Sequence, residues 1–355
     1  MTIFVVIMVF SVLILVHEAG HMFAAKRAGV NVEIFSLGFG KRLCGVEIGG
    51  TDYRISLFPL GGYVKMEGEE PGEAKGSETG LYSKPVGYRF WIMASGALTN
   101  YVFAFVLFWA IFMIGVPMPS NEVGEVIKDY PAEKAGIRTG DVIVKIDGKK
   151  VGYWDDIVDA IRTGSKSRET LTFDLLRDDE PLSIDVTPEI STVTNVFGQK
   201  ISRPMIGIGH RDKILPVSYG PAEAFYQGGR KLLSLTAMTY KGLWLMITGG
   251  MPLKESVSGP IGIMYLMNQA ARLGVVWLLI ITAQVSMALA IFNLLPFPVL
   301  DGGHIMFLAA EKIMGRPVSV KVQEILTNAA LILLIAFALF VSWQDVIKFR
   351  LLGGR

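Results

Sequence analysis

The chain of 355 residues is 51% hydrophobic and only 19% charged, with a mean hydropathy of +0.45. These values depart from those of soluble globular proteins toward those of membrane proteins. The net charge of +2 is too small to indicate a nucleic-acid partner or a strongly acidic one, and the single cysteine, Cys44, excludes an intrachain disulfide.

Four segments are apolar and long enough to cross a bilayer, which takes about 20 helical residues. They cover residues 3–25, 90–116, 275–295 and 326–343. The first could instead be a secretory signal peptide, but signal peptides carry positive charge before the apolar stretch. Here Lys26 and Arg27 follow the stretch, which favours a retained helix whose C-terminal end lies in the cytoplasm.

Alternating crossings then place residues 26–89 in the cytoplasm and residues 117–274 outside it. Basic residues in the first of these segments, and in the loop before the fourth helix, fit the positive-inside tendency. Those of the C-terminal tail, Lys348, Arg350 and Arg355, do not. We therefore expect a polytopic α-helical membrane protein with four transmembrane helices, the first within residues 1–30, the second within 90–117 and the last two within 274–355.

Residues 31–89, between the first two helices, are more than a simple loop. From residue 32 to residue 65, β-branched and aromatic residues are interspersed with glycines, which predicts short strands and turns. Apolar strands beside a bilayer predict a β-rich segment that re-enters the membrane and lines a cavity, the setting in which non-helical backbone is tolerated. The Glu-rich residues 67–78 are expected to form a solvated loop.

Residues 121–211 have the pattern of a soluble β-rich domain. We predict strands at residues 142–146, at the alternating Leu171, Phe173 and Leu175, and around Ile184 and Val186, with a helix at residues 155–161. In the following segment, basic residues interrupt the apolar residues 219–250. This pattern predicts amphipathic helices along the membrane surface within residues 212–273.

The sequence His17-Glu18-Ala19-Gly20-His21 is an H-E-x-x-H motif within the first apolar segment. Residues four apart share one face of a helix, so both imidazoles can bind one Zn²⁺ while Glu18 takes a proton from the attacking water. Ionisable groups are costly inside a bilayer and mark functional sites there. The alternative is that His17 and Glu18 only pair with polar groups across a helix bundle.

A catalytic zinc needs a third protein ligand and an open position. By the topology above, His210 lies on the other side of the membrane, which leaves Asp301 and His304 after the third helix. That segment and the H-E-x-x-H motif both lie near cytoplasmic helix ends, because the chain crosses the membrane an even number of times between them. They can therefore meet at one depth.

The residues alone leave the choice between Asp301 and His304 open. Asp301 follows two prolines that break the helix and precedes two glycines that permit close backbone approach. His304 could instead hydrogen-bond to a ligand or simply pack. Asp301 could also cap the helix that begins near residue 302, and Asn293 could hold substrate backbone or only end the third helix.

Motifs spread over nearly the whole chain resemble those of the site-2 proteases, and most closely those of the bacterial RseP-like branch with one PDZ domain. They are H-E-A-G-H at residues 17–21, G-F-G at 38–40, P-L-G-G-Y-V-K-M at 59–66, G-A-L-T-N at 96–100, S-G-P-I-G-I at 258–263 and N-L-L-P-F-P-V-L-D-G-G-H at 293–304. The family's G-P-x-x-N pattern has Ala97 in place of proline here. The resemblance implies an intramembrane zinc metalloprotease in which Asp301 is the third ligand beside His17 and His21.

The soluble segment is similar to the PDZ domains of periplasmic proteases. The similarity rests on P-A-E-K-A-G-I at residues 131–137, T-G-D-V-I at 139–143 and I-D-G at 146–148, and residues 121–211 have room for one such domain. Residues 206–209 could complete the domain or lead away from it. Because a PDZ fold captures peptide ends at a sheet edge, the domain is expected to bind or gate substrates.

The expected reaction is cleavage of a peptide bond within or beside a transmembrane segment that has been locally unwound. The strands that contain Gly38 and Gly40 could bind the substrate as an added strand, and Asn293, Pro296 and Pro298 could hold its opened backbone. The resemblance implies regulated intramembrane proteolysis of trimmed single-pass proteins, such as anti-sigma factors, and of remnant signal peptides. It also implies a bacterial inner (cytoplasmic) membrane, with the active site near the cytoplasmic side and the PDZ domain outside.

Two other functions fit parts of the sequence. One is a non-catalytic membrane scaffold that binds peptide tails through its PDZ domain, against which the intact set of His17, Glu18, His21 and Asp301 argues. The other is a membrane-anchored zinc protease of soluble substrates. Lys26 follows His17 by nine residues, about 13 Å along a helix, which places the metal below the membrane surface and favours the intramembrane reaction.

Overall fold

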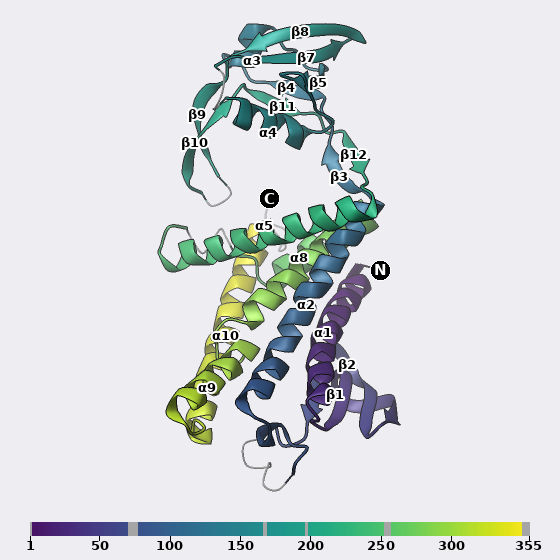
Figure 1. Cartoon of the computed structure of the whole chain (residues 1–355), viewed down its shortest axis with the longest axis vertical. Helices are drawn as coiled ribbons and strands as arrows, with labels where there is room; N and C mark the ends of the chain where they lie inside the picture. The colour runs from purple at the N-terminus through teal and green to yellow at the C-terminus, as the bar shows by residue number, and fades with distance from the viewer. Residues whose placement is uncertain (1, 70–76, 166–168, 196–197, 252–256, 350–355) are drawn as a thin grey trace. The chain divides into compact units, whose positions relative to one another are not determined.

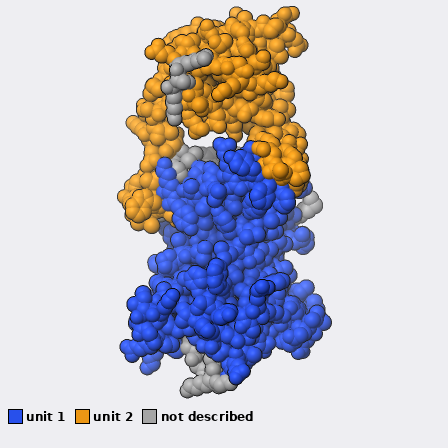
Figure 2. Space-filling view, in the orientation of Figure 1, with its two compact units in different colours: residues 1–111, 225–241, 253–355 blue, residues 112–224, 242–252 orange. Residues whose placement is uncertain are grey.

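The computed structural model describes residues 2–69, 77–165, 169–195, 198–251 and 257–349 (Figure 1). It divides into two compact units, which are coloured separately in Figure 2. Unit 1 comprises residues 1–111, 225–241 and 253–355, and unit 2 comprises residues 112–224 and 242–252.

Among the described residues, unit 1 contains four helices that are long and apolar enough to span a membrane. They are α1 (Thr2–Arg27), α2 (Val86–Ile114), α8 (Val275–Asn293) and α10 (Val320–Lys348). All four coincide with the predicted segments, which are therefore confirmed as long apolar helices. Large apolar side chains of α10, such as Ile332 and Leu339, are exposed, which is the surface that a lipid-facing helix requires.

Glycine permits close packing between α1 and α2 near the centre of unit 1. A Cβ atom at Gly20 of α1 would lie 2.4 Å from Thr99 Oγ1 and 2.5 Å from the Ser95 carbonyl oxygen, both on α2. Small residues allow helix backbones to approach closely inside membranes, where packing replaces the hydrophobic effect as the source of association.

A β-sheet covers part of α1. It is built from β1 (Val32–Ile48) and β2 (Thr51–Met66), which are two long bent strands rather than the predicted series of short ones. Residues 34–37 of β1 pair with residues 52–55 of β2 on one edge and with residues 62–65 on the other. Gly38 and Gly40, with φ angles of +91° and +89°, supply the left-handed backbone that lets β1 bend.

Shorter elements complete unit 1. They are the 3₁₀ turn η1 (Leu81–Ser83), α5 (Pro221–Ile247, of which residues 225–241 belong to this unit), α7 (Pro260–Leu273) and α9 (Asp301–Met314). Gly228 of α5 packs closely on the α2 backbone at Phe108 and Trp109. The prediction that α5 and α7 lie along the membrane surface stays a prediction. Of the loop predicted at residues 67–78, residues 70–76 lie outside the described residues.

Unit 2 is β-rich. Its strands are β3 (Val116–Pro119), β4 (Val123–Val126), β5 (Val142–Ile146), β6 (Lys149–Lys150), β7 (Leu171–Arg177), β8 (Glu180–Val186), β9 (Glu189–Thr194), β10 (Lys200–Met205), β11 (Ile208–His210) and β12 (Ile214–Val217). The helices are α3 (Pro131–Ala135) and α4 (Trp154–Gly164). A four-stranded sheet has the order β6-β5-β7-β8, and the remaining strands pair as β9 with β10, β4 with β11, and β3 with β12.

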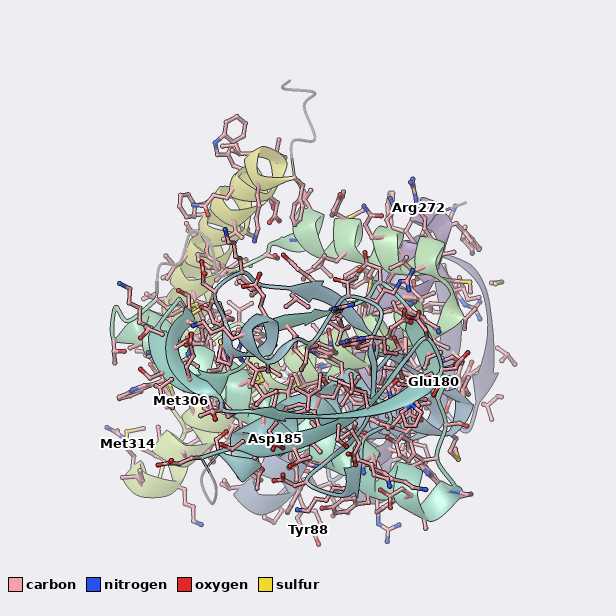
Figure 3. All side chains as sticks on the ribbon, turned by 90° about the horizontal axis from the view of Figure 1, so that it is seen from above. Tyr88, Glu180, Asp185, Arg272, Met306 and Met314 are labelled. Atoms are coloured by element: carbon pink, nitrogen blue, oxygen red, sulfur yellow. The ribbon has the colours of Figure 1, made fainter. Side chains whose placement is uncertain are left out.

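The core of unit 2 follows the predicted alternation. Leu171, Phe173 and Leu175 of β7 are buried, and the strands and helix expected at residues 142–186 are confirmed. Figure 3 labels Glu180 and Asp185 on β8, the outer strand of this sheet. Ile206 is part of the same core and β11 pairs with β4, so residues 206–209 belong to unit 2.

Candidate metal centre

His17 and His21 lie one helical turn apart on α1 and point toward the same space. Their Nε2 atoms are 3.2 Å apart, and the rings meet edge to face with centroids separated by 4.8 Å. Asp301, the first residue of α9, brings its Oδ2 atom to 3.3 Å from His17 Nε2 and 3.5 Å from His21 Nε2. Residues 280 positions apart in sequence therefore form a triangle of potential ligand atoms.

The triangle has the size that a tetrahedral zinc site requires. Zinc binds histidine nitrogen and carboxylate oxygen at about 2.0–2.1 Å, so neighbouring ligand atoms of a tetrahedral site lie about 3.3 Å apart. The three observed separations run from 3.2 to 3.5 Å. Asp301 Oδ2 is also buried without a regular hydrogen bond from any described residue. These donors fit a zinc ion with its fourth position open.

Neighbouring groups orient both imidazoles. His21 Nδ1 lies 2.8 Å from the carbonyl oxygen of Ile92 on α2, which fixes the proton on Nδ1 and leaves Nε2 free to bind a metal. The Asn293 amide nitrogen at the end of α8 lies 3.5 Å from His17 Nδ1. Rotating that amide by about 180° brings its oxygen to this position. The oxygen can then accept a hydrogen bond from the Nδ1–H group that His17 carries when its Nε2 binds a metal.

Glu18 is held beside the triangle by a strand of the sheet. The backbone N–H of Val64 donates to Glu18 Oε2 at 3.1 Å. Glu18 and the triangle line a cavity of about 170 Å³. Other residues that line it are Met66, Glu69, Leu81, Tyr82, Met93 and His304. The cavity brings a carboxylate and three potential metal ligands together, and metal-assisted hydrolysis requires these groups.

The loop between α8 and α9 explains how Asp301 reaches the histidines. A Cβ at Gly302 would lie 2.1 Å from the Leu295 carbonyl oxygen, and one at Gly303 would lie 2.4 Å from that of Phe297. Two glycines are therefore needed for the start of α9 to press against the proline-containing loop. Leu300, and not Asp301, is the N-cap residue of α9, and no side-chain hydrogen bond from it caps this helix end, so the structure does not place Asp301 in the N-cap position.

The two other histidines considered as ligands differ in their relation to this centre. His304 lies one turn after Asp301 and lines the cavity, whereas the atoms that could share a metal, among the described residues, come from His17, His21 and Asp301. His210 belongs to unit 2 and takes no part in this cavity.

The prolines and glycines predicted to hold substrate do not line the metal cavity. Pro296 lines a separate apolar cavity of about 490 Å³ between the α8–α9 loop and α10, and Pro298 contacts Gly303. Gly38 and Gly40 lie at the bends of β1, against Phe58. In this sheet the residues that line the metal cavity are Val64 and Met66.

Two contributors had no assigned role in the sequence analysis. Gly96 of α2 faces both histidines, and a Cβ there would lie 2.2 Å from His21 Nε2. It belongs to the G-A-L-T-N motif at residues 96–100, which is the sequence feature that could have identified it. Val64 acts through its backbone N–H, for which the side-chain pattern gives no signal.

The chain matches a known protein family over most of its length. The model of peptidase family M50 matches residues 5–337. A Clostridium perfringens protein named as a zinc metalloprotease is 34% identical, with 96% of this chain and 97% of that protein aligned. The regulator of sigma-E protease RseP of Escherichia coli is 32% identical, with 94% of this chain and 96% of that protein aligned.

Similarity to solved structures is found with PDZ domains. The PDZ domain of an SdrC-like protein from Listeria innocua is 24% identical, with 26% of this chain and 96% of that domain covered and a TM-score of 0.20. The corresponding domain from Listeria monocytogenes is 23% identical, with 28% of this chain and 95% of that domain covered and a TM-score of 0.21. Among the described residues, the predicted combination of four long apolar helices with a β-rich region is confirmed.

Proposed function

Because this chain belongs to peptidase family M50 and is a multi-pass membrane zinc metalloprotease, we propose that it cleaves the transmembrane segments of single-pass membrane proteins. The observation that carries this proposal is the position of the ligand triangle. His17, Glu18 and His21 lie inside the apolar span of α1, where ionisable groups are retained for function.

The proposed site lies below the membrane surface. Lys26 and Arg27 end α1, and His17 precedes Lys26 by about 13 Å of helix. We place this end of α1 in the cytoplasm of a bacterial cell, at the inner membrane, because basic residues at helix ends favour that side. Unit 2 then lies outside the cytoplasm. A protease of soluble substrates would need no such depth.

We assign the zinc ligands as His17 Nε2, His21 Nε2 and Asp301 Oδ2. The bound zinc would supply Lewis acidity toward the scissile carbonyl and lower the pKa of the attacking water. Glu18 would take the proton from that water and deliver it to the leaving amide nitrogen. The Val64 N–H, by holding Glu18 Oε2, keeps this carboxylate turned toward the cavity.

A strand edge beside Glu18 supports binding of an unwound substrate. Residues 62–65 of β2 pair with β1 on one side. On the opposite side, the N–H groups of Val64 and Met66 donate to the carboxylates of Glu18 and Glu69. An extended substrate segment can add along such an edge through its backbone. Gly38 and Gly40 would act by bending the sheet, and Asn293, Pro296 and Pro298, at and after the end of α8, by holding the opened backbone of the substrate.

We assign substrate selection to unit 2, as a PDZ domain that binds or filters the trimmed ends of substrates. The Escherichia coli relative is named as the regulator of sigma-E protease RseP. By extension, we propose that substrates of this chain are anti-sigma-factor-like single-pass proteins and remnant signal peptides, and that cleavage is a step of regulated intramembrane proteolysis.

Purified wild type and Glu18→Gln in nanodiscs test this function. Both should retain one zinc ion by mass spectrometry, whereas only wild type should cleave a single-pass model substrate, at a peptide bond that mass mapping places within its apolar segment. Zinc-loaded wild type that cuts nothing beyond what Glu18→Gln cuts would support a scaffold instead. Cleavage confined to soluble peptides would support the membrane-anchored alternative.

A further inference from the structure

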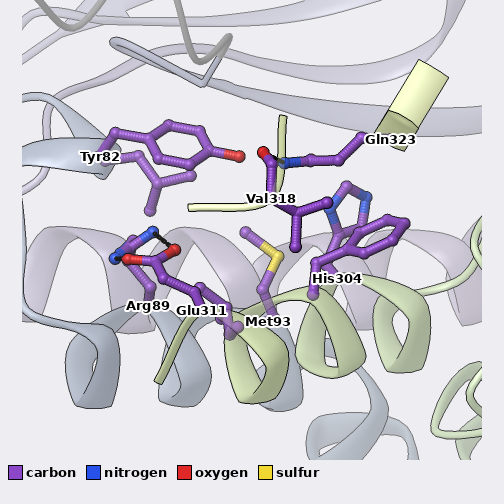
Figure 4. A pocket seen from close by; sticks show the side chains of 10 residues that line it. Tyr82, Arg89, Met93, His304, Glu311, Val318 and Gln323 are labelled. Atoms are coloured by element: carbon purple, nitrogen blue, oxygen red, sulfur yellow. Dashed lines mark hydrogen bonds and ion pairs between the residues drawn. The ribbon is translucent and has the colours of Figure 1, made fainter. Parts of the chain in front are cut away.

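A buried ion pair lies next to the metal cavity without being part of it. A smaller cavity of about 30 Å³ shares Leu81, Tyr82, Met93 and His304 with the metal cavity. Its far wall contains Arg89 of α2 and Glu311 of α9, joined by the dashed lines in Figure 4. In that view Met93 lies between the ion pair and His304.

Each of the three guanidinium nitrogens of Arg89 donates a hydrogen bond. Its Nη1 donates to Glu311 Oε2 at 3.0 Å and its Nη2 donates to Glu311 Oε1 at 2.5 Å, while Nε donates to the Lys84 carbonyl oxygen at 3.1 Å. The Arg89 guanidinium carbon also lies 5.3 Å from the ring centre of Tyr82. Only 7% of the Arg89 side chain and 15% of the Glu311 side chain are exposed, so both charges have been removed from most of their water.

Such a pair is a poor device for stability alone. Removing two charges from water costs about as much as their attraction returns, and replacing a buried pair by apolar residues is often neutral or stabilising. What the bidentate contact does supply is geometry, because two parallel hydrogen bonds fix both the distance and the orientation of the carboxylate. The location of the pair indicates which geometry is being fixed.

The pair joins the same two helices that meet at the metal site. Gly96, two turns after Arg89 on α2, contacts His17 and His21. Asp301, ten residues before Glu311 on α9, faces the same histidines. Glu311 therefore lies about 15 Å along α9 from Asp301, and the two side chains leave the helix about 80° apart. Any rotation of α9 that breaks the ion pair also turns Asp301 away from the histidines.

We propose that the Arg89–Glu311 ion pair is a positioning device that holds α9 at the angle at which Asp301 completes the zinc site. The inference rests on the proposed function, because it takes Asp301 as a ligand. Neither residue touches the metal. Their effect is to keep the third ligand atom within reach of the other two, which raises the affinity for zinc.

The test measures zinc affinity by competition with a chelator of known affinity, on the full chain in nanodiscs. Glu311→Gln keeps the shape of the side chain and removes its charge, and Arg89→Lys keeps the charge and removes the bidentate contact. Both should weaken zinc binding about tenfold or more, the scale seen when groups that orient metal ligands are removed. The exchanged variant Arg89→Glu with Glu311→Arg should recover part of the loss, because it restores the pair.

Arg177→Gln is the matched control. Arg177 makes a comparable bidentate contact with the buried Asp141 within unit 2, so its loss should leave zinc affinity unchanged. Affinities are compared on the monodisperse fraction, and Arg89→Lys carries the test if Glu311→Gln does not fold. Wild-type affinity in both single variants would overturn the proposal, and so would an equal loss in the single and exchanged variants.

Asp301→Asn separates this inference from the proposed function. If Asp301→Asn retains wild-type zinc affinity, the ligand assignment fails and the positioning role fails with it, whereas the proposed function fails only if zinc-loaded wild type cuts nothing beyond what Glu18→Gln cuts. If Asp301→Asn loses zinc while Glu311→Gln and Arg89→Lys bind it normally, only the positioning role is wrong.

Discussion

Gly96 of α2 lies so close to His21 of α1 that a Cβ atom at position 96 would be 2.2 Å from His21 Nε2 and 2.8 Å from His17 Cε1. Contacts below 3 Å between such atoms do not occur without movement. The absence of a side chain at position 96 is therefore what allows α2 to pass directly beside the proposed zinc ligands. The packing of two helices and the geometry of the site depend on the same residue.

Replacing Gly96 by alanine should disrupt the metal centre. The added methyl group must displace His21, His17 or the α2 backbone, and displacement of a ligand atom by even 1 Å is costly to catalysis. We expect Gly96→Ala to lose zinc, or to lower cleavage of a single-pass model substrate at least 100-fold, by the assays described above.

Gly87 provides a control on the same helix. A Cβ at Gly87 meets nothing within 4 Å among the described residues, so Gly87→Ala should retain zinc and activity. If Gly96→Ala also binds zinc and cleaves normally, α2 does not confine the histidines in the way that the structure indicates.

The third ligand can be identified by comparing two neighbouring residues. Asp301 Oδ2 completes the triangle with the histidine nitrogens, whereas His304 only lines the cavity. Asp301→Asn should therefore lose most of its bound zinc, and His304→Gln should retain it. Metal content of the purified variants gives the answer, and loss of zinc from His304→Gln alone would transfer the ligand role to His304.

Local sequence patterns predicted the parts of this site that lie close together in the chain. His17, Glu18 and His21 share one helix, so their spacing was sufficient to predict that they lie together. Asp301 and His304 lie one turn apart on α9, so spacing could not separate them. That choice depends on the turn of the loop before Asp301, which is set by backbone contacts of Gly302 and Gly303 with residues several positions earlier.

The helical spans were predicted to within about six residues at each end, because the hydropathy of the segments largely determines them. The sheet was harder, because the pairing of both β1 edges with β2 depends on where the backbone bends, and several glycines could have supplied the bend. The β9–β10 hairpin was not predicted. Pro204 within β10 argues against a strand in sequence, although its pairing with Ile190 shows that it lies in one.

The strand edge at Val64 and Met66 predicts where a substrate will be found. In a background of Cys44→Ala and Glu18→Gln, which removes the native thiol and prevents turnover, Met66→Cys should form a disulfide with a cysteine in the apolar segment of a model substrate. Met66 lines the metal cavity, so the bound segment should pass beside it. Cross-linking is read by gel mobility without reductant.

Ile48→Cys is the comparison for that experiment. Ile48 is exposed at the far end of β1, where a thiol is more accessible than at the buried position 66 but distant from Val64 in the strand register. Cross-linking that favours position 48 over position 66 would place the substrate elsewhere than on the edge beside Glu18.

The Asp141–Arg177 pair predicts a pH-dependent stability of unit 2. Asp141 is 1% exposed, and both its oxygens accept hydrogen bonds from Arg177, with a further one from the Arg138 N–H. Burial alone would raise the pKa of Asp141, but the hydrogen bonds and charge of Arg177, together with the Arg138 N–H, outweigh it, so the pKa lies below its ordinary value. We expect Arg177→Gln to destabilise unit 2 by about 1–3 kcal/mol at neutral pH, because it leaves a buried carboxylate with fewer partners.

The sign of the pH dependence follows from the direction of that shift. A carboxyl group whose pKa is lower in the folded state stabilises the fold fully above its unfolded pKa, about 3.9 for aspartate, and loses this contribution as the pH falls toward the folded value. The difference between wild type and Arg177→Gln should therefore be constant from pH 7 to about pH 5 and shrink below about pH 4. Hydrogen exchange of the β5 and β7 amides in the full chain, corrected for the intrinsic rate at each pH, measures this difference. A difference that grew on acidification would mean that the pair does not hold Asp141 ionised, and that its contribution to unit 2 is packing alone.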